Sequence, residues 1–456
     1  MITPIKVVKT GMYWVRKSDL TDVQISQIQR QYTYQHPKDE EDTFYTFIET
    51  DDKIGVPTGD TNKLKKILNT VTVEDRTVVL KFDTPVKSDN LVLRDYQETA
   101  MQEIQDYFNS GGTTFNLAGK PGSGKSYMLA ALLAKMKMKV LIVAHLTSLI
   151  DQIKNEIETA TGMTVTVLNA KNTVIGDINV ATSQFISRNT DVWYQIKTGI
   201  GMLVIDESES AASLSTLRII QRCYAKYRVF ISATFSRSVD DRTEALKDVA
   251  GHKRITLHAQ DMLNPTVIQV QCPEIFNNPV NKNLYQKAKG VFFKNPGIDE
   301  KVILVTKASI KKDRQVLIAV DIIDVQNRLK QKLEADGITC GIMNGETKAK
   351  DRVQILQDYN DGKIKVLLGV NVLNAGLSIP KITTIVKVSI PSSSEKLEQL
   401  IGRLRRKFEG KQGAWFIDLH FKGFKCQKSF YVKKVREESW KYHETTWDAF
   451  VKQISG

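Results

Sequence analysis

The sequence predicts an α/β fold with two parallel sheets flanked by helices, preceded by a small α+β domain. From Leu91 onward, near-continuous apolar, β-rich runs alternate with helix-like segments. This pattern is typical of parallel strands that crossover helices bury on both faces. The runs form two series, at residues 139–145, 177–183, 202–208 and 227–234, and at residues 314–320, 338–344, 365–371 and 383–390. The two series share no sequence repeat, so we interpret them as a structural duplication.

The first 90 residues lack this alternation of apolar runs and helix-like segments. The β-rich runs DTFYTFIET and RTVVLKFDT accompany the polar, helix-like stretch SDLTDVQISQIQRQYTYQ, which predicts a small accessory domain. We expect four parts of the chain: this domain at 1–90, a first α/β domain at 91–260, a linker and the start of the second half at 261–312, and a second α/β domain with a basic tail at 313–456.

The composition, 41% hydrophobic and 25% charged, is typical of a globular protein without a membrane domain. No apolar run reaches the ~18 residues that a spanning helix needs, and the N-terminus lacks the apolar core of a signal peptide. We therefore expect a cytoplasmic protein with no membrane partner. Its four cysteines are scattered without a CxxC pair, which favours reduced structural thiols over disulfides or a zinc site.

The formal net charge of +14 is concentrated late in the chain. Residues 271–456 hold 33 Lys and Arg against 20 Asp and Glu. A basic surface in one region favours a polyanionic partner, since each phosphate that is neutralised releases counterions. Composition alone leaves a basic surface without any partner equally open.

The stretch GKPGSGKS fits the phosphate-binding pattern G-x-x-x-x-G-K-[ST]. It lies between the strand-like FNL and the helix-like SYMLAALLAKM, so its backbone N–H groups and a helix N-terminus can surround phosphates. We expect Lys125 to reach the β and γ phosphates of ATP and the Ser126 hydroxyl to bind Mg²⁺. The expected nucleotide-binding residues of this loop are Gly119, Lys120, Pro121, Gly122, Ser123, Gly124, Lys125 and Ser126.

The stretch MLVIDESE is an apolar strand followed by acids, about eighty residues after the loop. A phosphate-binding loop needs such a strand-terminal acid to hold Mg²⁺. We assign Asp206 as this magnesium ligand and Glu207 as the group that orients or deprotonates the attacking water. Glu209 is interpreted as a solvated loop acid.

At this point the chain resembles the superfamily 2 helicases, from about Leu91 to Lys407. The phosphate loop, the acidic motif and SAT at 232–234 occur in that family's order. LRDYQETA, VLIVAHLTSLIDQ, INVATSQFIS, ITCGIMNGETKAKDR, VLLGVNVLNAGLSIP and EQLIGRLRRK resemble its remaining motifs. The resemblance implies two RecA-like domains that hydrolyse ATP with Mg²⁺.

The resemblance also assigns roles to individual residues. Gln97 would read the adenine edge, and Thr147 and Thr182 would contact a nucleic-acid backbone. Ser232, Thr234, Gly376 and Gln399 would couple hydrolysis to movement. Arg403 and Arg406, from the second RecA-like domain, would stabilise charge at the γ-phosphate. Arg405 and Lys407 are expected to face solvent or DNA.

Several positions depart from the family's patterns. Glu209 and Gln399 argue against its RNA-unwinding DEAD-box branch. His145 replaces a usual proline, while Asn371 and Asn374 stand where acids are common, which puts the nucleic-acid contacts in doubt but not the ATPase.

Two C-terminal stretches have open interpretations. Residues 405–436 alternate basic residues with aromatics, which suits nucleic-acid stacking and an edge strand with solvated lysines equally well. The stretch SWKYHETTWDAFVKQ predicts a closing helix whose Trp440, Trp447 and Val451 lie in the core.

The resemblance predicts an ATP-dependent DNA helicase or translocase, most similar to phage-encoded branch-migration helicases that remodel forks and Holliday junctions in recombination, repair or replication. Its expected partner is branched or duplex DNA, bound by a monomer or weak oligomer. Three alternatives remain: an RNA helicase of the same superfamily, a P-loop kinase or GTPase, and a binding module with a vestigial ATP site. The absent N-K-x-D motif counts against a GTPase.

Overall fold

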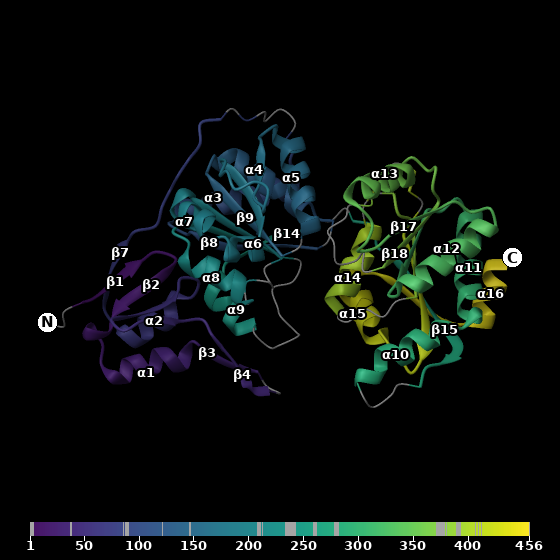
Figure 1. The fold of residues 1–456 in the computed structure, drawn as a ribbon, viewed down its shortest axis with the longest axis horizontal. Coiled ribbons are helices and arrows are strands. Elements are labelled where there is room, and N and C mark those ends of the chain that lie inside the picture. The colour runs from purple at the N-terminus through teal and green to yellow at the C-terminus, as the bar shows by residue number, and fades with distance from the viewer. Residues whose placement is uncertain are drawn as a thin grey trace. The chain divides into compact units, whose positions relative to one another are not determined.

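The computed structural model describes residues 4–36, 39–84, 86, 91–120, 122–145, 147–207, 211, 213–232, 243–258, 262–277, 282–370, 379, 381–388, 394–405, 407–408, 410–411 and 413–455. The chain divides into two contact units, Met1–Ala259 and Gln260–Gly456 (Figure 1). Each unit is built around one seven-stranded parallel sheet, and the first unit also carries a small mixed sheet. The predicted fold class is confirmed.

The accessory part of the first unit is a five-stranded sheet in the order β5-β6-β2-β1-β7. Its strands are β1 (Ile5–Lys9), β2 (Met12–Arg16), β5 (Ile48–Glu49), β6 (Lys53–Pro57) and β7 (Val71–Asp75). The helices α1 (Asp22–Gln31) and α2 (Thr61–Leu68) and the hairpin β3 (Thr33–His36) and β4 (Asp39–Tyr45) complete it. The strand expected in RTVVLKFDT is wrong: Val78 and Lys81 make only isolated bridges, and the strand lies earlier, at β7.

The first large sheet has the order β10-β11-β9-β12-β13-β8-β14, with all neighbours parallel. Its strands are β8 (Thr114–Gly119), β9 (Val140–Ala144), β10 (Val165–Val167), β11 (Ile178–Thr182), β12 (Met202–Asp206), β13 (Tyr227–Ser232) and β14 (Arg254–Leu257). The central strand β9 is apolar and buried at every position, and the first four residues of β12 are too, because both faces of the sheet are covered, as the uninterrupted runs predict.

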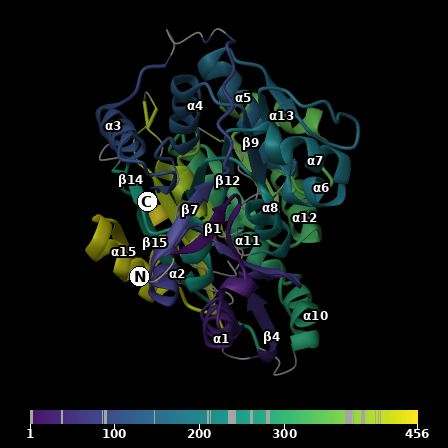
Figure 2. The ribbon, with the colours of Figure 1, turned by 90° about the vertical axis from the view of Figure 1, so that its left-hand side faces the viewer.

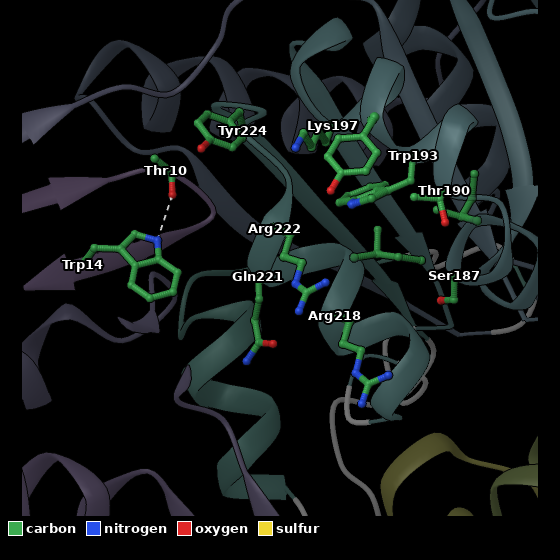
Figure 3. Close-up of a pocket in the computed structure, with 13 residues that line it drawn as sticks. Thr10, Trp14, Ser187, Thr190, Trp193, Lys197, Arg218, Gln221, Arg222 and Tyr224 are labelled. Carbon is green, nitrogen blue, oxygen red and sulfur yellow. Dashed lines mark hydrogen bonds between the residues drawn. The ribbon is translucent and has the colours of Figure 1, made fainter. Parts of the chain in front are cut away.

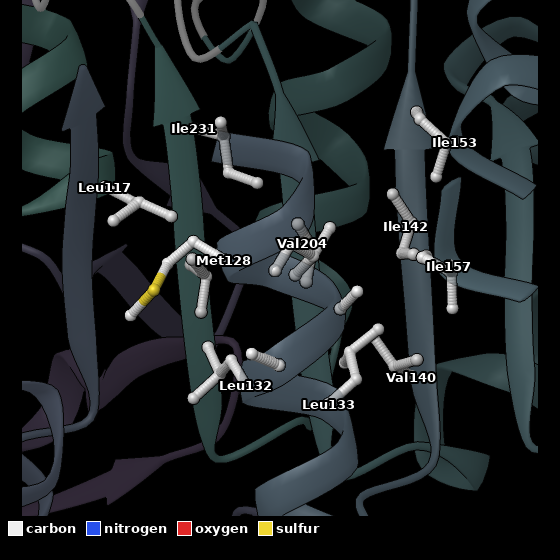
Figure 4. Close-up of a cluster of buried hydrophobic side chains, with 14 of the residues drawn as sticks. Leu117, Met128, Leu132, Leu133, Val140, Ile142, Ile153, Ile157, Val204 and Ile231 are labelled. Carbon is white, nitrogen blue, oxygen red and sulfur yellow. The ribbon is translucent and has the colours of Figure 1, made fainter. Parts of the chain in front are cut away.

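Helices cover the two faces of this sheet (Figure 2). One face carries α3 (Asp95–Asn109), α4 (Lys125–Met136) and α5 (Thr147–Thr161), and the other carries α6 (Ser183–Arg188), α7 (Thr190–Gly199), α8 (Leu214–Arg222) and α9 (Thr243–Ala250). Figure 4 shows α4 running alongside the strands on one face of the sheet, with Met128, Leu132 and Leu133 packed against Val204 and Val140. This packing fixes the start of α4, and with it the phosphate loop, against the sheet.

Buried polar links fix the accessory sheet to the first large sheet. The guanidinium of Arg228, on β13, donates to the carbonyl oxygen of Gly11 at 3.0 Å and to Thr58 Oγ1 at 2.7 Å. Asp248, on α9, is fully buried and forms an ion pair of 2.6 Å with Lys63. Burial lowers the pKa of Arg228, so these acceptors compensate a charge removed from water. Residues 1–90 therefore belong to the same contact unit as the first α/β domain.

We expect Arg228→Ala to lower the free energy of unfolding of the first unit by about 2–4 kcal/mol, because the substitution leaves several buried acceptors without a donor. Urea denaturation followed by circular dichroism measures the loss. Arg254→Ala, at an exposed position on β14, is the matched control. Equal denaturation midpoints for the two variants would show that the Arg228 contacts do not hold the accessory sheet.

The second unit is a parallel sheet in the order β17-β18-β16-β19-β20-β15-β21. Its strands are β15 (Thr266–Ile275), β16 (Val316–Val320), β17 (Cys340–Met343), β18 (Val366–Val370), β19 (Thr384–Lys387), β20 (Trp415–Lys422) and β21 (Lys441–Thr446). Its helices are α10 (Lys282–Phe292), α11 (Pro296–Lys311), α12 (Ile323–Ala335), α13 (Ala349–Asn360), α14 (Ser394–Gly402), α15 (Lys428–Glu438) and α16 (Trp447–Ser455). Residues 261–312 thus contribute β15, α10 and α11 to this unit.

The edge-strand interpretation of the basic and aromatic stretch 405–436 is wrong, and two of its aromatic rings are not available for stacking. β20 is an interior strand, paired with β19 and β15, rather than an edge strand. Phe421 and Phe424 are buried against Phe276, Phe292 and Phe293, so these rings belong to the core and cannot stack on bases.

The closing helix expected in SWKYHETTWDAFVKQ is partly wrong, because its first half forms the edge strand β21 and only α16 is helical. Trp440 is buried and Trp447 packs against the core, as expected, while Val451 is half-buried.

The four cysteines are free, and three of them, Cys223, Cys272 and Cys340, are buried. Among the described residues, no helix is long and apolar enough to cross a membrane.

Candidate nucleotide site

The predicted site residues of the first unit gather at one edge of its sheet. Since all seven strands are parallel, their carboxyl ends lie together at this edge. There β8 runs into the phosphate loop, and β9 is followed by His145 and Thr147. β11 ends at Thr182, β12 at Asp206 and β13 at Ser232. Motifs that are more than a hundred residues apart in the chain therefore meet at one place.

The phosphate loop connects β8 to α4, as the sequence predicts. Gly124 is the N-cap of α4 and has φ +80°, and a Cβ there would lie 2.6 Å from Gln97 Nε2. A Cβ on Gly119 would lie 2.4 Å from Ser123 Oγ, so the serine side chain would have to move, while the positive φ of Gly124 strains any residue with a Cβ. Lys125 Nζ donates to the carbonyl oxygen of Gly119 at 2.5 Å, which holds the ammonium group over the loop. The Ser123 hydroxyl is buried without a hydrogen-bond partner among the described residues, so the loop holds a polar group that a ligand can satisfy.

Helix α3 supports this loop from behind. Tyr96 donates its hydroxyl hydrogen to the carbonyl oxygen of Ser123 at 3.0 Å, and Gln97 Nε2 lies 3.4 Å from the carbonyl oxygen of Gly124. Gln97 Oε1 also accepts from the backbone N–H of Arg94 at 3.1 Å. The buried Gln97 amide thus positions the loop and the start of its own helix. Its expected contact with adenine has not been tested and stays a prediction.

The acidic pair lies directly beyond β12. Burial and the adjacent Glu207 carboxylate raise the pKa of Asp206 to about 7, while the Lys125 charge, a backbone hydrogen bond from Glu207 and the His145 charge act in the opposite direction. Glu207 has φ +53°, in the left-handed region that side chains other than glycine rarely adopt. Its Oε2 lies 3.2 Å from Nδ1 of His145. The structure therefore brings the Lys125 and Asp206 charges within interaction range of each other and places a histidine against Glu207.

The donor chemistry of this site fits Mg²⁺. The Ser126 hydroxyl, in the first turn of α4, and the Asp206 carboxylate are hard oxygen ligands of the kind Mg²⁺ prefers. Among the described residues no cluster of three or more His, Cys, Asp or Glu side chains could hold a metal alone. This arrangement suits Mg²⁺, which is usually bound by one or two protein ligands together with water and nucleotide phosphates.

The remaining predicted residues are placed in part. Thr147 begins α5 and is exposed, while Thr182 caps α6 by accepting from the backbone N–H of Phe185 at 3.1 Å. In the second unit, Gln399 lies on α14 and Arg403 begins the 3-10 helix Arg403–Arg405, both half-buried. The positions outside the described residues are Pro121, Glu209, Thr234, Gly376 and Arg406.

Arg405 does not face solvent or DNA, as the sequence suggested. It is buried and forms an ion pair of 2.6 Å with the equally buried Glu438 of α15. Its guanidinium carbon also lies 5.8 Å from the ring centroid of Trp440. This arginine is part of the packing of the second unit.

The sequence also gave no role to His145 beyond its departure from a family pattern. His145 lies one residue after β9, and β9 neighbours β12 in the sheet. This position is the signal that could have predicted its contact with Glu207. Two residues that follow adjacent parallel strands lie close to each other at the same edge.

Two family models match the chain. Residues 90–237 match the model described as type III restriction enzyme, res subunit, and residues 300–407 match the helicase conserved C-terminal domain. The first match contains the phosphate loop and the acidic pair, and the second contains Arg403.

Individual relatives agree with these matches. A probable helicase of Escherichia phage T5 is 24% identical over 67% of this chain and 67% of its own length. The ATP-dependent RNA helicase RhlB of Pseudomonas aeruginosa is 22% identical, but the match covers only 33% of this chain and 36% of that protein. A solved structure of S. cerevisiae Dbp5 bound to RNA and ADP BeF3 superposes with a TM-score of 0.55 at 15% identity, covering 80% of this chain and 98% of that one. The matches to these two family models, one of them a helicase domain, and the helicase relative over two thirds of the chain show that the chain belongs to the superfamily 2 helicases.

Proposed function

We propose that this chain is an ATP-dependent DNA helicase or translocase that remodels branched DNA, such as forks and Holliday junctions, in recombination, repair or replication. The observation that carries the ATPase is the grouping of Lys125, Asp206 and Glu207 at one edge of a parallel sheet. A second parallel sheet with a helicase family match supports movement on nucleic acid over a P-loop kinase or GTPase.

The chemistry follows from the side chains at this edge. The Lys125 ammonium, released from the Gly119 carbonyl, would bind the β and γ phosphates. Mg²⁺, held by Ser126 and Asp206, would neutralise phosphate charge. Glu207, oriented by His145, would accept a proton from the attacking water or align it. Each group is placed by a strand end or helix start, so little reorganisation is needed at the moment of reaction.

The second unit has a separate role in this proposal. Arg403 and Arg406 would add positive charge to the transition state, as arginine fingers do. Ser232, Thr234, Gly376 and Gln399 would couple hydrolysis to opening of the two halves, and Thr147 and Thr182 would hold the nucleic-acid backbone. Alternate grip on phosphates would then turn each hydrolysis cycle into a step along the strand.

One observation bears on DNA against RNA. Glu209 and Gln399 depart from the patterns of the RNA-unwinding branch. The printed names of RhlB and Dbp5 keep an RNA substrate as the second candidate. We propose DNA as the partner, a monomer or weak oligomer as the working form, and the cytoplasm as its place.

The test measures ATP hydrolysis and strand separation by the full chain with single-stranded DNA, blunt duplex, forks, Holliday junctions and RNA duplex. We expect the branched DNA substrates to give the largest stimulation. Stronger stimulation by RNA duplex would overturn the DNA assignment. Hydrolysis that no nucleic acid stimulates would overturn the helicase or translocase activity itself.

A further inference from the structure

A pocket of about 350 Å³ lies in the first unit between the accessory sheet and helices α6, α7 and α8 (Figure 3). It is separate from the nucleotide site. Helix α8 starts after the carboxyl end of β12 and returns to the start of β13, so Arg222 and Tyr224 lie toward the edge of the sheet opposite Asp206. None of the residues assigned above to ATP, Mg²⁺ or the nucleic-acid backbone lines this pocket.

The lining of the pocket is basic. Lys197, Arg218 and Arg222 contribute positive charge, and no acidic residue is among the lining residues. Arg218 and Arg222 are four residues apart on α8, so both project from one side of the helix and repel each other. Both are exposed, and neither forms an ion pair among the described residues. An anion in the pocket would relieve this repulsion.

Aromatic rings line the same pocket. Figure 3 shows the indoles of Trp14 and Trp193 toward opposite ends, with Arg222 between them in this view. Trp14 is held by a hydrogen bond of 3.2 Å from its Nε1 to Thr10 Oγ1, and its ring lies against Gly55, where a Cβ would approach it to 2.7 Å. Tyr194 is 61% exposed, and the Lys197 ammonium group lies 4.1 Å from the centroid of its ring.

The walls of the pocket are fixed relative to each other. The Arg228 guanidinium donates to the carbonyl oxygens of both Thr10 and Cys223. Thr10 belongs to the accessory part and Cys223 follows α8, so this arginine links the two walls. Gln221 Nε2, on α8, also donates to the carbonyl oxygen of Thr46 in the accessory part, at 2.8 Å. The pocket is thus preformed, so a ligand would not have to order it.

We propose that this pocket binds a nucleotide unit of an unpaired nucleic-acid strand, with its phosphates at Arg218 and Arg222 and its base against the aromatic rings. Basic residues that follow a backbone, together with rings on which bases stack, are the chemistry of single-strand binding. The inference rests on the proposed action on nucleic acid and adds a second contact, made by residues other than Thr147 and Thr182. It gives the accessory sheet a role, because Trp14 comes from that sheet.

The experiment photocrosslinks the full chain to a single-stranded oligo(dT) that carries 5-iododeoxyuridine, and maps the crosslinked peptides by mass spectrometry. We expect crosslinks at Trp14, Trp193 or Tyr194. In parallel, fluorescence anisotropy measures oligo(dT) affinity at several salt concentrations for Arg218→Ala/Arg222→Ala. Lys135→Ala/Lys171→Ala removes the same charge from exposed positions outside the pocket and is the matched control.

The double arginine variant is expected to lower the salt slope of log affinity by about 1.4, at ~0.7 for each lost phosphate contact. Tyr194→Ala, at an exposed position that folding does not depend on, is expected to weaken binding about fivefold or more. Deoxythymidine monophosphate is the competitor: if it removes the pocket crosslinks at an equal nucleotide concentration, the ligand is a free nucleotide, and if it does not, the ligand is a strand.

Crosslinks that map elsewhere, with both arginine and tyrosine variants binding as the control does, would overturn the inference. That result is distinguishable from failure of the proposed function, since wild-type hydrolysis would still respond to nucleic acid. A wild-type protein without any such response would instead overturn the function.

Discussion

Glu207→Gln lowers the turnover number for ATP by about 10²- to 10⁴-fold, because an amide of the same shape cannot accept the proton of the attacking water. The carboxylate lies one residue beyond β12, in a left-handed backbone conformation, with Oε2 at 3.2 Å from His145 Nδ1. Glutamine preserves the size of the side chain, so the phosphate loop and its Lys125 remain in place. Affinity for a fluorescent ATP analogue should therefore stay within about threefold of wild type. Steady-state hydrolysis and equilibrium binding together measure the split.

The control for this variant is Glu103→Gln, which removes an exposed carboxylate paired with Lys253 on the same unit. An exposed pair contributes little to stability, so the control should hydrolyse ATP as wild type does. Undiminished turnover in Glu207→Gln would show that Glu207 is not the group that acts on the attacking water. The roles proposed for Asp206 and Lys125 would remain.

Most of the two parallel sheets could be predicted from the sequence because their strands are uninterrupted apolar runs. Val140–Ala144 and Val316–Val320 are buried at every position, and such runs favour parallel strands that helices cover on both faces. The strands that escaped prediction carry polar residues inward. On β20, Asp418 is fully buried and accepts from Lys387 at 2.5 Å and from the hydroxyl of Tyr431 at 2.8 Å. From the sequence alone, charged residues such as these predict an exposed strand, because the partners that allow their burial are not visible there.

The part of the candidate site that could be predicted from the sequence consists of motifs that lie at the ends of strands. Lys125 and Asp206 meet because each motif includes its own strand, and parallel strands end at one edge. The contact between His145 and Glu207 depends on β9 and β12 being neighbours, which neither motif encodes alone. The basic pocket was not predictable from the sequence. Its residues come from the accessory sheet and from α7 and α8, and these parts meet where the buried Arg228 on β13 donates to the accessory part.

The arginines of RLRRK illustrate the same limit and give a prediction that separates catalysis from stability. The sequence separates Arg403, expected at the γ-phosphate, from Arg405, expected to face solvent or DNA, but Arg405 is buried in the ion pair with Glu438. Arg403→Ala is expected to lower turnover by about 10³- to 10⁵-fold, the effect of losing an arginine finger. Because Arg403 is half-buried and lies outside that pair, the melting temperature should fall less than that of a variant that breaks the Arg405 ion pair.

Arg405→Ala is the contrasting variant. It leaves the Glu438 carboxylate buried without its partner, so it should cost about 3–5 kcal/mol of stability and lower the melting temperature of the second unit. Calorimetry and steady-state hydrolysis on both variants measure the two effects independently. If Arg403→Ala keeps turnover within threefold of wild type, this arginine is not a finger. If Arg403→Ala melts as early as Arg405→Ala, its loss of activity reports unfolding instead, and Arg406 becomes the arginine to test.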